Sequence, residues 1–219
     1  CPLNLFPKVF DIIIRSRVYV RSLANTTGLS AVNTTLPLIT ALCAGYALAS
    51  RHFYGKRVFF VFLLVPMYFG GGLIPFYIIV NAYGLNNTYF ALILPNLVNI
   101  FYIIVFRNAI NRLPGEVTES AEIDGATEYT ILFRIVLPLI LPMVMAFTIF
   151  SAVAFWNEWF NVLIFIRDQS KWTLQYMLRS LYSQPNFAGG GVLEGVLVEH
   201  PDLINPLNLT MAAIICTVA

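Results

Sequence analysis

Long apolar runs without charge dominate the pattern of hydrophobic and polar positions along this chain. No Asp, Glu, Lys, Arg or His occurs in residues 22–50 or 58–106, and residues 135–166 carry a single charge, Glu158. The chain is again uncharged from residue 203 to its end. A helix that spans a bilayer needs about 20 apolar residues, and non-helical backbone is costly in lipid. The pattern therefore predicts an all-α integral membrane protein.

Turn-forming residues set the number of predicted spans. The uncharged run 58–106 is 49 residues long, which is too long for one crossing and suits two. Residues 81–87 are rich in Asn and Gly, so we expect the break there. The predicted spans lie near residues 22–50, 58–80, 88–107, 137–166 and 203–219, and the last is cut off by the end of the sequence.

Composition agrees with a membrane protein and narrows the functional classes. Apolar residues make up 58% of the chain and charged residues 11%, whereas a soluble domain carries about 25% charged residues. The net charge of +2 gives no argument for a nucleic-acid partner. No phosphate-binding P-loop, catalytic set or metal-ligand cluster can be assembled from the sequence, and the three cysteines form no zinc or disulfide pattern. We therefore expect neither an enzyme nor a bound cofactor or metal.

Loop charges predict the orientation of the spans. The short loop 51–57 holds three Lys or Arg residues, and the short loop 81–87 holds none. The positive-inside rule places the first of these loops in the cytoplasm. Alternation then places residues 108–134 in the cytoplasm as well, and residues 1–21 and 167–202 outside.

Proline and glycine interrupt several predicted spans. One interpretation is packing and kinking, because neighbouring helices can satisfy the freed backbone groups. The other is that the segment GGGLIP, residues 70–75, locally opens a helix beside a path for a solute.

An acidic island interrupts the apolar chain between two predicted spans. Five of the 11 acidic residues fall within 13 positions, namely Glu116, Glu119, Glu122, Asp124 and Glu128. The first three share one helical face at a spacing of three. The island is either a solvated loop or an anionic docking element for a cationic partner.

Local signals predict a short helix, a turn and a second helix across this island. Pro114 suits a first helical turn, and Gly125 can close that helix in a left-handed turn. Asp124 can then cap the following helix. Four apolar residues of the second helix recur at the spacing of one helical face, namely Tyr129, Leu132, Phe133 and Val136.

The same residues resemble the EAA loop of ABC importer permeases. That loop has the pattern EAA, three residues, Gly, nine residues, Ile, one residue and Leu-Pro. Here Ser120 replaces the first Ala, and its small side chain should preserve the tight helix. The strings AEIDGAT…FRIVLPL, GGLIPFY, YALASRHFYGKR and WNEWF are similar to the carbohydrate branch of this family, in the same order. The resemblance covers about residues 20–219.

The resemblance implies a type I importer permease, a multi-pass protein of the bacterial plasma membrane. Two such subunits would form the pore, a cytoplasmic ATPase dimer would bind ATP and Mg, and an extracytoplasmic binding protein would deliver the solute. A further helix would precede residue 1, residues 1–20 would form an extracytoplasmic loop and residues 21–219 the transport domain. Within 108–134 and the start of the next span, the residues implied to couple to the ATPase are Glu119, Ser120, Ala121, Asp124, Gly125, Ala126, Ile135, Leu137 and Pro138.

The resemblance and modest chemistry suggest a sugar as the solute. Aromatic faces and hydrogen-bonding groups would occur within one helical turn at Trp156, Asn157, Glu158 and Trp159. The interruption at Gly71 and Gly72, with Tyr77, completes the expected solute path. The aromatic residues could instead form an interfacial belt, and in pores built from two different permeases the other subunit can hold the sugar.

Three other functions are alternatives to a sugar importer. An ion-coupled secondary transporter would use intramembrane ionisable groups, and only Glu158 qualifies. An intramembrane enzyme would need a catalytic set that the chain does not offer. An ABC importer of a solute other than a sugar would share the EAA loop.

Overall fold

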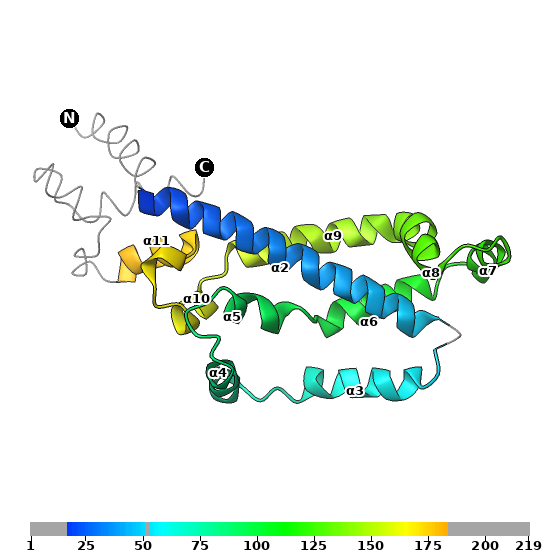
Figure 1. Cartoon of the computed structure of the whole chain (residues 1–219), viewed down its shortest axis with the longest axis horizontal. Helices are drawn as coiled ribbons and strands as arrows, with labels where there is room; N and C mark the ends of the chain where they lie inside the picture. Colours follow the sequence, from blue (N-terminus) through cyan, green and yellow to red (C-terminus); the bar gives the residue numbers. More distant parts are fainter. Residues whose placement is uncertain (1–16, 51–52, 184–219) are drawn as a thin grey trace, which may run out of the picture. The chain divides into compact units, whose positions relative to one another are not determined.

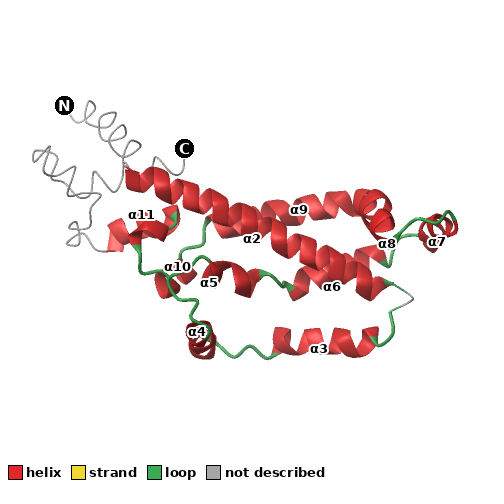
Figure 2. Cartoon of the chain, viewed as in Figure 1, coloured by secondary structure: helices red, strands yellow, loops and turns green. Residues whose placement is uncertain are grey.

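The computed structural model describes residues 17–50 and 53–183, and within these residues it is helical without strands (Figure 2). The predicted all-α fold is confirmed. The span expected at 203–219 lies outside the described residues. The main helices are α2 (Arg17–Ala49), α3 (Lys56–Tyr68), α4 (Leu73–Ala82), α5 (Phe90–Ile93), α6 (Ile100–Ile110), α7 (Gly115–Ile123), α8 (Glu128–Thr130), α9 (Leu137–Trp156), α10 (Phe160–Phe165) and α11 (Leu174–Ser183) (Figure 1).

Three helical stretches of the described chain are long and apolar enough to cross a membrane, at Arg17–Ala49, Phe90–Ile110 and Glu128–Trp156. They correspond to the predicted spans 22–50, 88–107 and 137–166. A fourth crossing results if the bent pair α3 and α4 counts as one span. Helix α2 begins at Arg17, so residues 17–20, which were expected in the loop over 1–20, are helical; Arg is a good helix former and extends the helix beyond its apolar part.

The span expected at 58–80 is broken into two helices. Helices α3 and α4 meet at 113° across a break that contains Gly70, Gly71 and Gly72. Gly72 has a φ of 79°, a conformation outside the right-handed helix that glycine adopts without a steric cost. The break agrees with both interpretations of this segment, and its role in a solute path stays a prediction.

Two further predicted spans are also interrupted. In the span expected at 88–107, α5 gives way to the 3₁₀-helix η2 (Leu94–Asn96), because Pro95 lacks the N–H that an α-helix needs. Asn99 then caps α6 by accepting a hydrogen bond from Tyr102 N at 3.2 Å. In the span expected at 137–166, α9 ends at Trp156 and α10 begins only at Phe160.

The described chain forms two compact units. Residues 17–29, 86–92 and 156–183 belong to the first unit, and residues 30–50, 53–85 and 93–155 to the second unit. The first unit has a small apolar core at Leu92, Val162 and Ile166.

The core of the second unit lies where α2 and α6 approach each other and the start of α9. Ala41, Phe106 and Val136 are fully buried there. A Cβ atom on Gly45 would lie 3.1 Å from both the backbone N of Arg107 and the Cβ of Phe106. Helices in lipid associate through close van der Waals packing, which small residues permit. Gly45 therefore sets the distance between α2 and α6.

We expect Gly45→Val to destabilise the protein by about 1–3 kcal/mol, because the added methyl groups meet helix backbone that cannot yield easily. Gly28→Val is the matched control: Gly28 lies in the same helix, and a Cβ there meets nothing within 4 Å. The measurement is the midpoint of thermal unfolding of the purified protein in detergent. Equal midpoints for the two variants would contradict close packing at Gly45.

Candidate functional site

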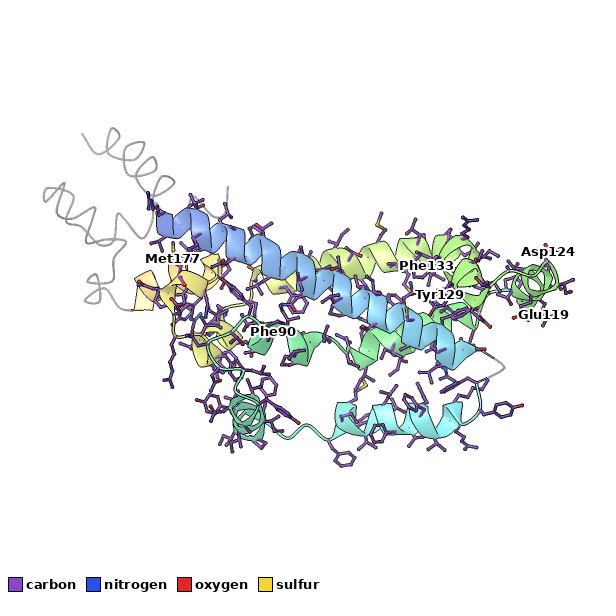
Figure 3. All side chains as sticks on the ribbon, in the orientation of Figure 1. Phe90, Glu119, Asp124, Tyr129, Phe133 and Met177 are labelled. Atoms are coloured by element: carbon purple, nitrogen blue, oxygen red, sulfur yellow. The ribbon has the colours of Figure 1, made fainter. Side chains whose placement is uncertain are left out.

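Helix α7 carries the acidic island at one end of the second unit. It begins at Gly115, so Pro114 precedes the first turn instead of lying in it, and none of its residues is buried. Figure 1 shows α7 beyond the end of α9 at which α8 lies, and Figure 3 shows Glu119 and Asp124 on it. Ile123, at the end of α7, is 86% exposed. The helix therefore presents acidic and apolar side chains outward.

A closed turn at Gly125 ends α7. Gly125 has a φ of 77°, which confirms the predicted left-handed turn. The N–H of Ala126 donates to Ala121 O at 3.0 Å, and the N–H of Gly125 donates to Glu122 O at 3.0 Å. These two bonds form a complete Schellman motif, which satisfies the last carbonyls of the helix. A turn closed in this way holds the direction of the chain that follows.

The expected cap of the next helix at Asp124 is wrong. Asp124 is the last residue of the α7 turn, and its N–H donates to Ser120 O. Thr127 caps α8 instead, because its extended backbone lets the side chain accept a hydrogen bond from Thr130 N. The Schellman turn needs two residues after Asp124, which moves the helix start to residue 128.

The helix after the turn does not have the predicted apolar face. Residues Ile131–Val136 form a π-helix, η3, whose wider turn changes which residues share a face. Ile131, Leu132 and Val136 are buried, while Tyr129 and Phe133 are 77% and 45% exposed. Both exposed rings are labelled in Figure 3. The four residues predicted to share one helical face therefore differ in burial: Leu132 and Val136 are buried, and Tyr129 and Phe133 are exposed.

A cavity of about 360 Å³ lies between α7 and the end of α2. Three carboxylates line it, from Glu119, Glu122 and Glu128, together with Tyr46. The Tyr46 hydroxyl donates a hydrogen bond to the Glu128 carboxylate. Tyr46 was not predicted as a site residue, and its position in the string YALASRHFYGKR was the only signal. The arrangement can accept a cationic side chain.

The structure brings the predicted coupling residues into one continuous element. Ala121, Ala126 and Leu137 pack against the core of the second unit, and α7 contacts η3. Glu119, Ser120, Asp124, Gly125 and Pro138 are exposed, and Ile135 is half-buried. Ser120 Oγ donates to Glu116 O, so this serine fits the helix as expected.

The predicted solute-path residues do not form one helical turn. Trp156 ends α9, and Asn157, Glu158 and Trp159 lie in the break before α10. Glu158 Oε1 accepts a hydrogen bond from Asn161 N at 3.0 Å, and Glu158 O accepts one from Thr173 Oγ1 at 3.2 Å. These bonds satisfy polar groups that the break leaves without helical partners.

The other three predicted solute-path residues belong to the second unit. Gly71 and Gly72 are exposed in the break between α3 and α4, and Tyr77 is half-buried on α4.

A polar network in the first unit was not predicted. Asn87 has a φ of 60°, and its Oδ1 accepts hydrogen bonds from the N–H groups of Arg167 and Asp168 at 3.2 and 3.0 Å. Lys171 Nζ donates to Asn87 O at 2.6 Å. The N–H of Ser170 lowers the pKa of the Asp168 carboxyl, and Lys171 lowers it further, so Asp168 stays ionised near neutral pH.

Asn25 in α2 binds the segment around residues 170–172 to that helix. Asn25 Nδ2 donates to Ser170 O at 2.9 Å and to Trp172 O at 3.2 Å, and Tyr89 OH donates to Asn25 Oδ1 at 3.0 Å. The available signal was the presence of polar residues in an otherwise apolar helix, because such groups bond across neighbouring segments.

Comparison with known proteins identifies the family. Residues 38–219 match the family described as "Binding-protein-dependent transport system inner membrane component". The chain belongs to this family. The predicted resemblance to importer permeases and the multi-pass membrane location are confirmed.

Individual relatives agree with this assignment. The chain is 37% identical to Protein LplC of Bacillus subtilis over 81% of this chain and 62% of that protein. It is 33% identical to the arabinooligosaccharides transport system permease protein AraQ of Halalkalibacterium halodurans, over 78% and 62% of the two chains. The chain thus spans about 62% of the length of these relatives.

A solved structure shows the same fold. The bacterial ABC transporter "involved in the import of the acidic polysaccharide alginate" contains a chain that is 26% identical, with a TM-score of 0.83 over 95% of this chain and 73% of that one. The predicted permease helix bundle is therefore confirmed.

We expect Asn87→Gly to loosen the segment 165–171, because glycine keeps the positive φ but removes the Oδ1 acceptor. Each lost hydrogen bond is worth about 0.5–1.5 kcal/mol, so amide hydrogen exchange in a peptide covering Arg167 and Asp168 should accelerate roughly tenfold. Asn111→Gly, at the exposed end of α6, serves as the control. Unchanged protection in Asn87→Gly would show that the side chain does not hold the segment.

Proposed function

We propose that this chain is the transmembrane permease subunit of an ATP-driven, binding-protein-dependent importer. The observation that carries the proposal is the closed helix–turn element at 115–138, in a chain that belongs to a binding-protein-dependent transport family. A second permease subunit completes the pore, a cytoplasmic ATPase dimer binds ATP and Mg, and an extracytoplasmic binding protein delivers the solute. The chain itself hydrolyses nothing.

The solute is a sugar or an oligosaccharide. Support comes from the relatives: AraQ is named for arabinooligosaccharides, and the transporter with the similar structure imports alginate. One of these glycans is neutral and the other acidic, so the relatives support the carbohydrate class without selecting the charge. Trp156, Asn157, Glu158 and Trp159 offer aromatic and hydrogen-bonding groups in this chain.

Helix α7 couples the permease to the ATPase. Its exposed carboxylates suit a cationic cleft, and exposed Ile123 adds an apolar contact. Glu119 and Glu122 face the same cavity as Glu128, so a basic side chain inserted there would meet three carboxylates. The ATPase cleft would hold α7 in this way.

Motion passes from α7 to the membrane through the turn and η3. The Schellman bonds at Gly125 fix the angle between α7 and α8. Ala121 and Ala126 pack on the same core as Leu132 and Val136, and η3 continues directly into α9. Closure of the ATPase dimer would therefore move α9 together with α7, which gives alternating access.

A secondary transporter fits the chain less well. Such a carrier couples through ionisable groups inside the membrane. Glu158 lies in a break, with one carboxylate oxygen bound to the backbone N–H of Asn161.

Glu119→Lys tests the docking of α7. The reversed charge replaces attraction by repulsion, and loss of one partner of a buried charge pair costs about 2–5 kcal/mol. We therefore expect solute-stimulated ATPase activity of the reconstituted complex to fall at least tenfold while the chain still inserts. Glu116→Lys makes the same change on the same helix at a residue that does not line the cavity, and we expect a smaller effect. Normal assembly and transport by Glu119→Lys would identify the island as a solvated loop.

Gly125→Val tests the turn itself. A Cβ at Gly125 meets nothing within 4 Å, so any effect arises from the positive φ and not from crowding. We expect Gly125→Val to lower solute-stimulated ATPase activity, while Gly125→Asn, which tolerates the left-handed conformation, retains most of it. Equal activities of the two variants in the assembled complex would argue against a coupling role for the turn geometry.

A further inference from the structure

An arginine stacks on a tryptophan beside the break between α9 and α10. The guanidinium carbon of Arg179, on α11, lies 3.5 Å from the centre of the Trp159 ring. Phe160 meets the same ring edge-on, with the centroids 5.6 Å apart. Stacking fixes the plane of a guanidinium and leaves the N–H groups along its edge able to bind a ligand.

The carboxylates of the described first unit already have other partners. Glu158 accepts a hydrogen bond from Asn161 N, and Asp168 accepts one from Ser170 N and lies 4.0 Å from Lys171 Nζ. No carboxylate in the described part of the chain forms an ion pair with Arg179, which is exposed. Among the described residues, the stacked arginine therefore presents donors in a fixed orientation without a carboxylate to receive them.

The charge of the unit favours an anionic ligand. Its described residues hold five cationic side chains and two carboxylates. The five cations are Arg17, Arg21, Arg167, Lys171 and Arg179. An excess of positive charge attracts anionic ligands and raises their local concentration.

We propose that the solute of this transporter is a carboxylate-bearing oligosaccharide, and that Arg179, oriented by Trp159, binds one of its carboxylates. This inference rests on the proposed importer function. Arginine binds carboxylates through two parallel N–H···O bonds, and a planar fork held in place loses little freedom on binding. Interrupted membrane helices are where transporters place their ligand sites, and Trp159 lies in such an interruption.

An acidic surface of a binding protein is a different partner for the same charges. The stacking of Arg179 on Trp159 favours the glycan over a protein surface, because it fixes the plane of the guanidinium for one carboxylate. A protein surface steered by charge alone would use the other exposed arginines equally.

The experiment compares tetragalacturonate with its fully methyl-esterified form, which has the same length and no charge. Tetramannuronate and neutral arabinotetraose complete the set of probes. ATP-dependent uptake is measured in proteoliposomes that contain the complete importer with its binding protein. We expect the wild type to take up at least one of the two acidic tetrasaccharides with a half-saturating concentration at least tenfold below that of the methyl ester.

Substitutions then assign the effect to Arg179. In Arg179→Gln, the half-saturating concentration of the acidic probe should rise at least tenfold, while that of the ester stays unchanged. Arg179→Lys should give a value between those of the wild type and Arg179→Gln. Arg167→Gln, at an exposed arginine of the same unit that stacks on no aromatic ring of the described residues, should behave as the wild type. An equal loss for acid and ester in Arg179→Gln would mean that the pair is purely structural, and would overturn the inference.

Other outcomes separate this inference from the proposed function. If the wild type takes up arabinotetraose but neither acidic probe, the importer function stands and the inference fails. If no glycan is taken up in the presence of ATP, the proposed function fails. If Arg179→Gln weakens stimulation of the ATPase by the binding protein equally for all probes, the arginine serves the protein surface and the inference is overturned.

Discussion

The positive φ of Gly125 is the constraint on which the proposed mechanism depends. It closes α7 with two backbone hydrogen bonds and turns the chain so that Ala121 and Ala126 pack on the core of the second unit. The same core contains Leu132 and Val136 of η3, which continues into α9. A force applied to α7 therefore reaches a membrane-spanning helix through packed side chains and one closed turn, without a flexible linker.

The features that the sequence predicted correctly are those that depend on local chemistry. Uncharged runs mark the spanning segments because lipid excludes charge, and Gly125 marks a left-handed turn because other residues would be strained there. The breaks within spans were harder to predict. Apolar composition is the same for a straight helix and a broken one, so the interruption at residues 157–159 depends on partners such as Thr173, which are distant in sequence. The capping residue was misplaced for a related reason, because a Schellman turn uses two residues beyond the helix.

The missed site residues share one property: each is defined by a contact across the fold. Tyr46 meets Glu128 over 82 positions, and Asn87 holds the backbone of Arg167 and Asp168 over 80 and 81 positions. Neither residue belongs to a spacing pattern that local rules detect. The π-helical geometry of η3 was also beyond such rules, and it explains why Tyr129 and Phe133 are exposed while Leu132 and Val136, at the spacing of the same helical face, are buried.

Rigid coupling between α7 and α9 is the central claim, and one distance tests it most directly. Spin labels at Ile123 on α7 and Ile149 on α9 would both occupy exposed positions of the second unit. Pulsed electron paramagnetic resonance of the complete importer should give one narrow distribution of the distance between the two labels. This distribution should be the same in the absence of nucleotide and with ATP trapped in the ATPase. A distribution that shifts or broadens when ATP binds would show that α7 moves independently of α9 and would contradict the account.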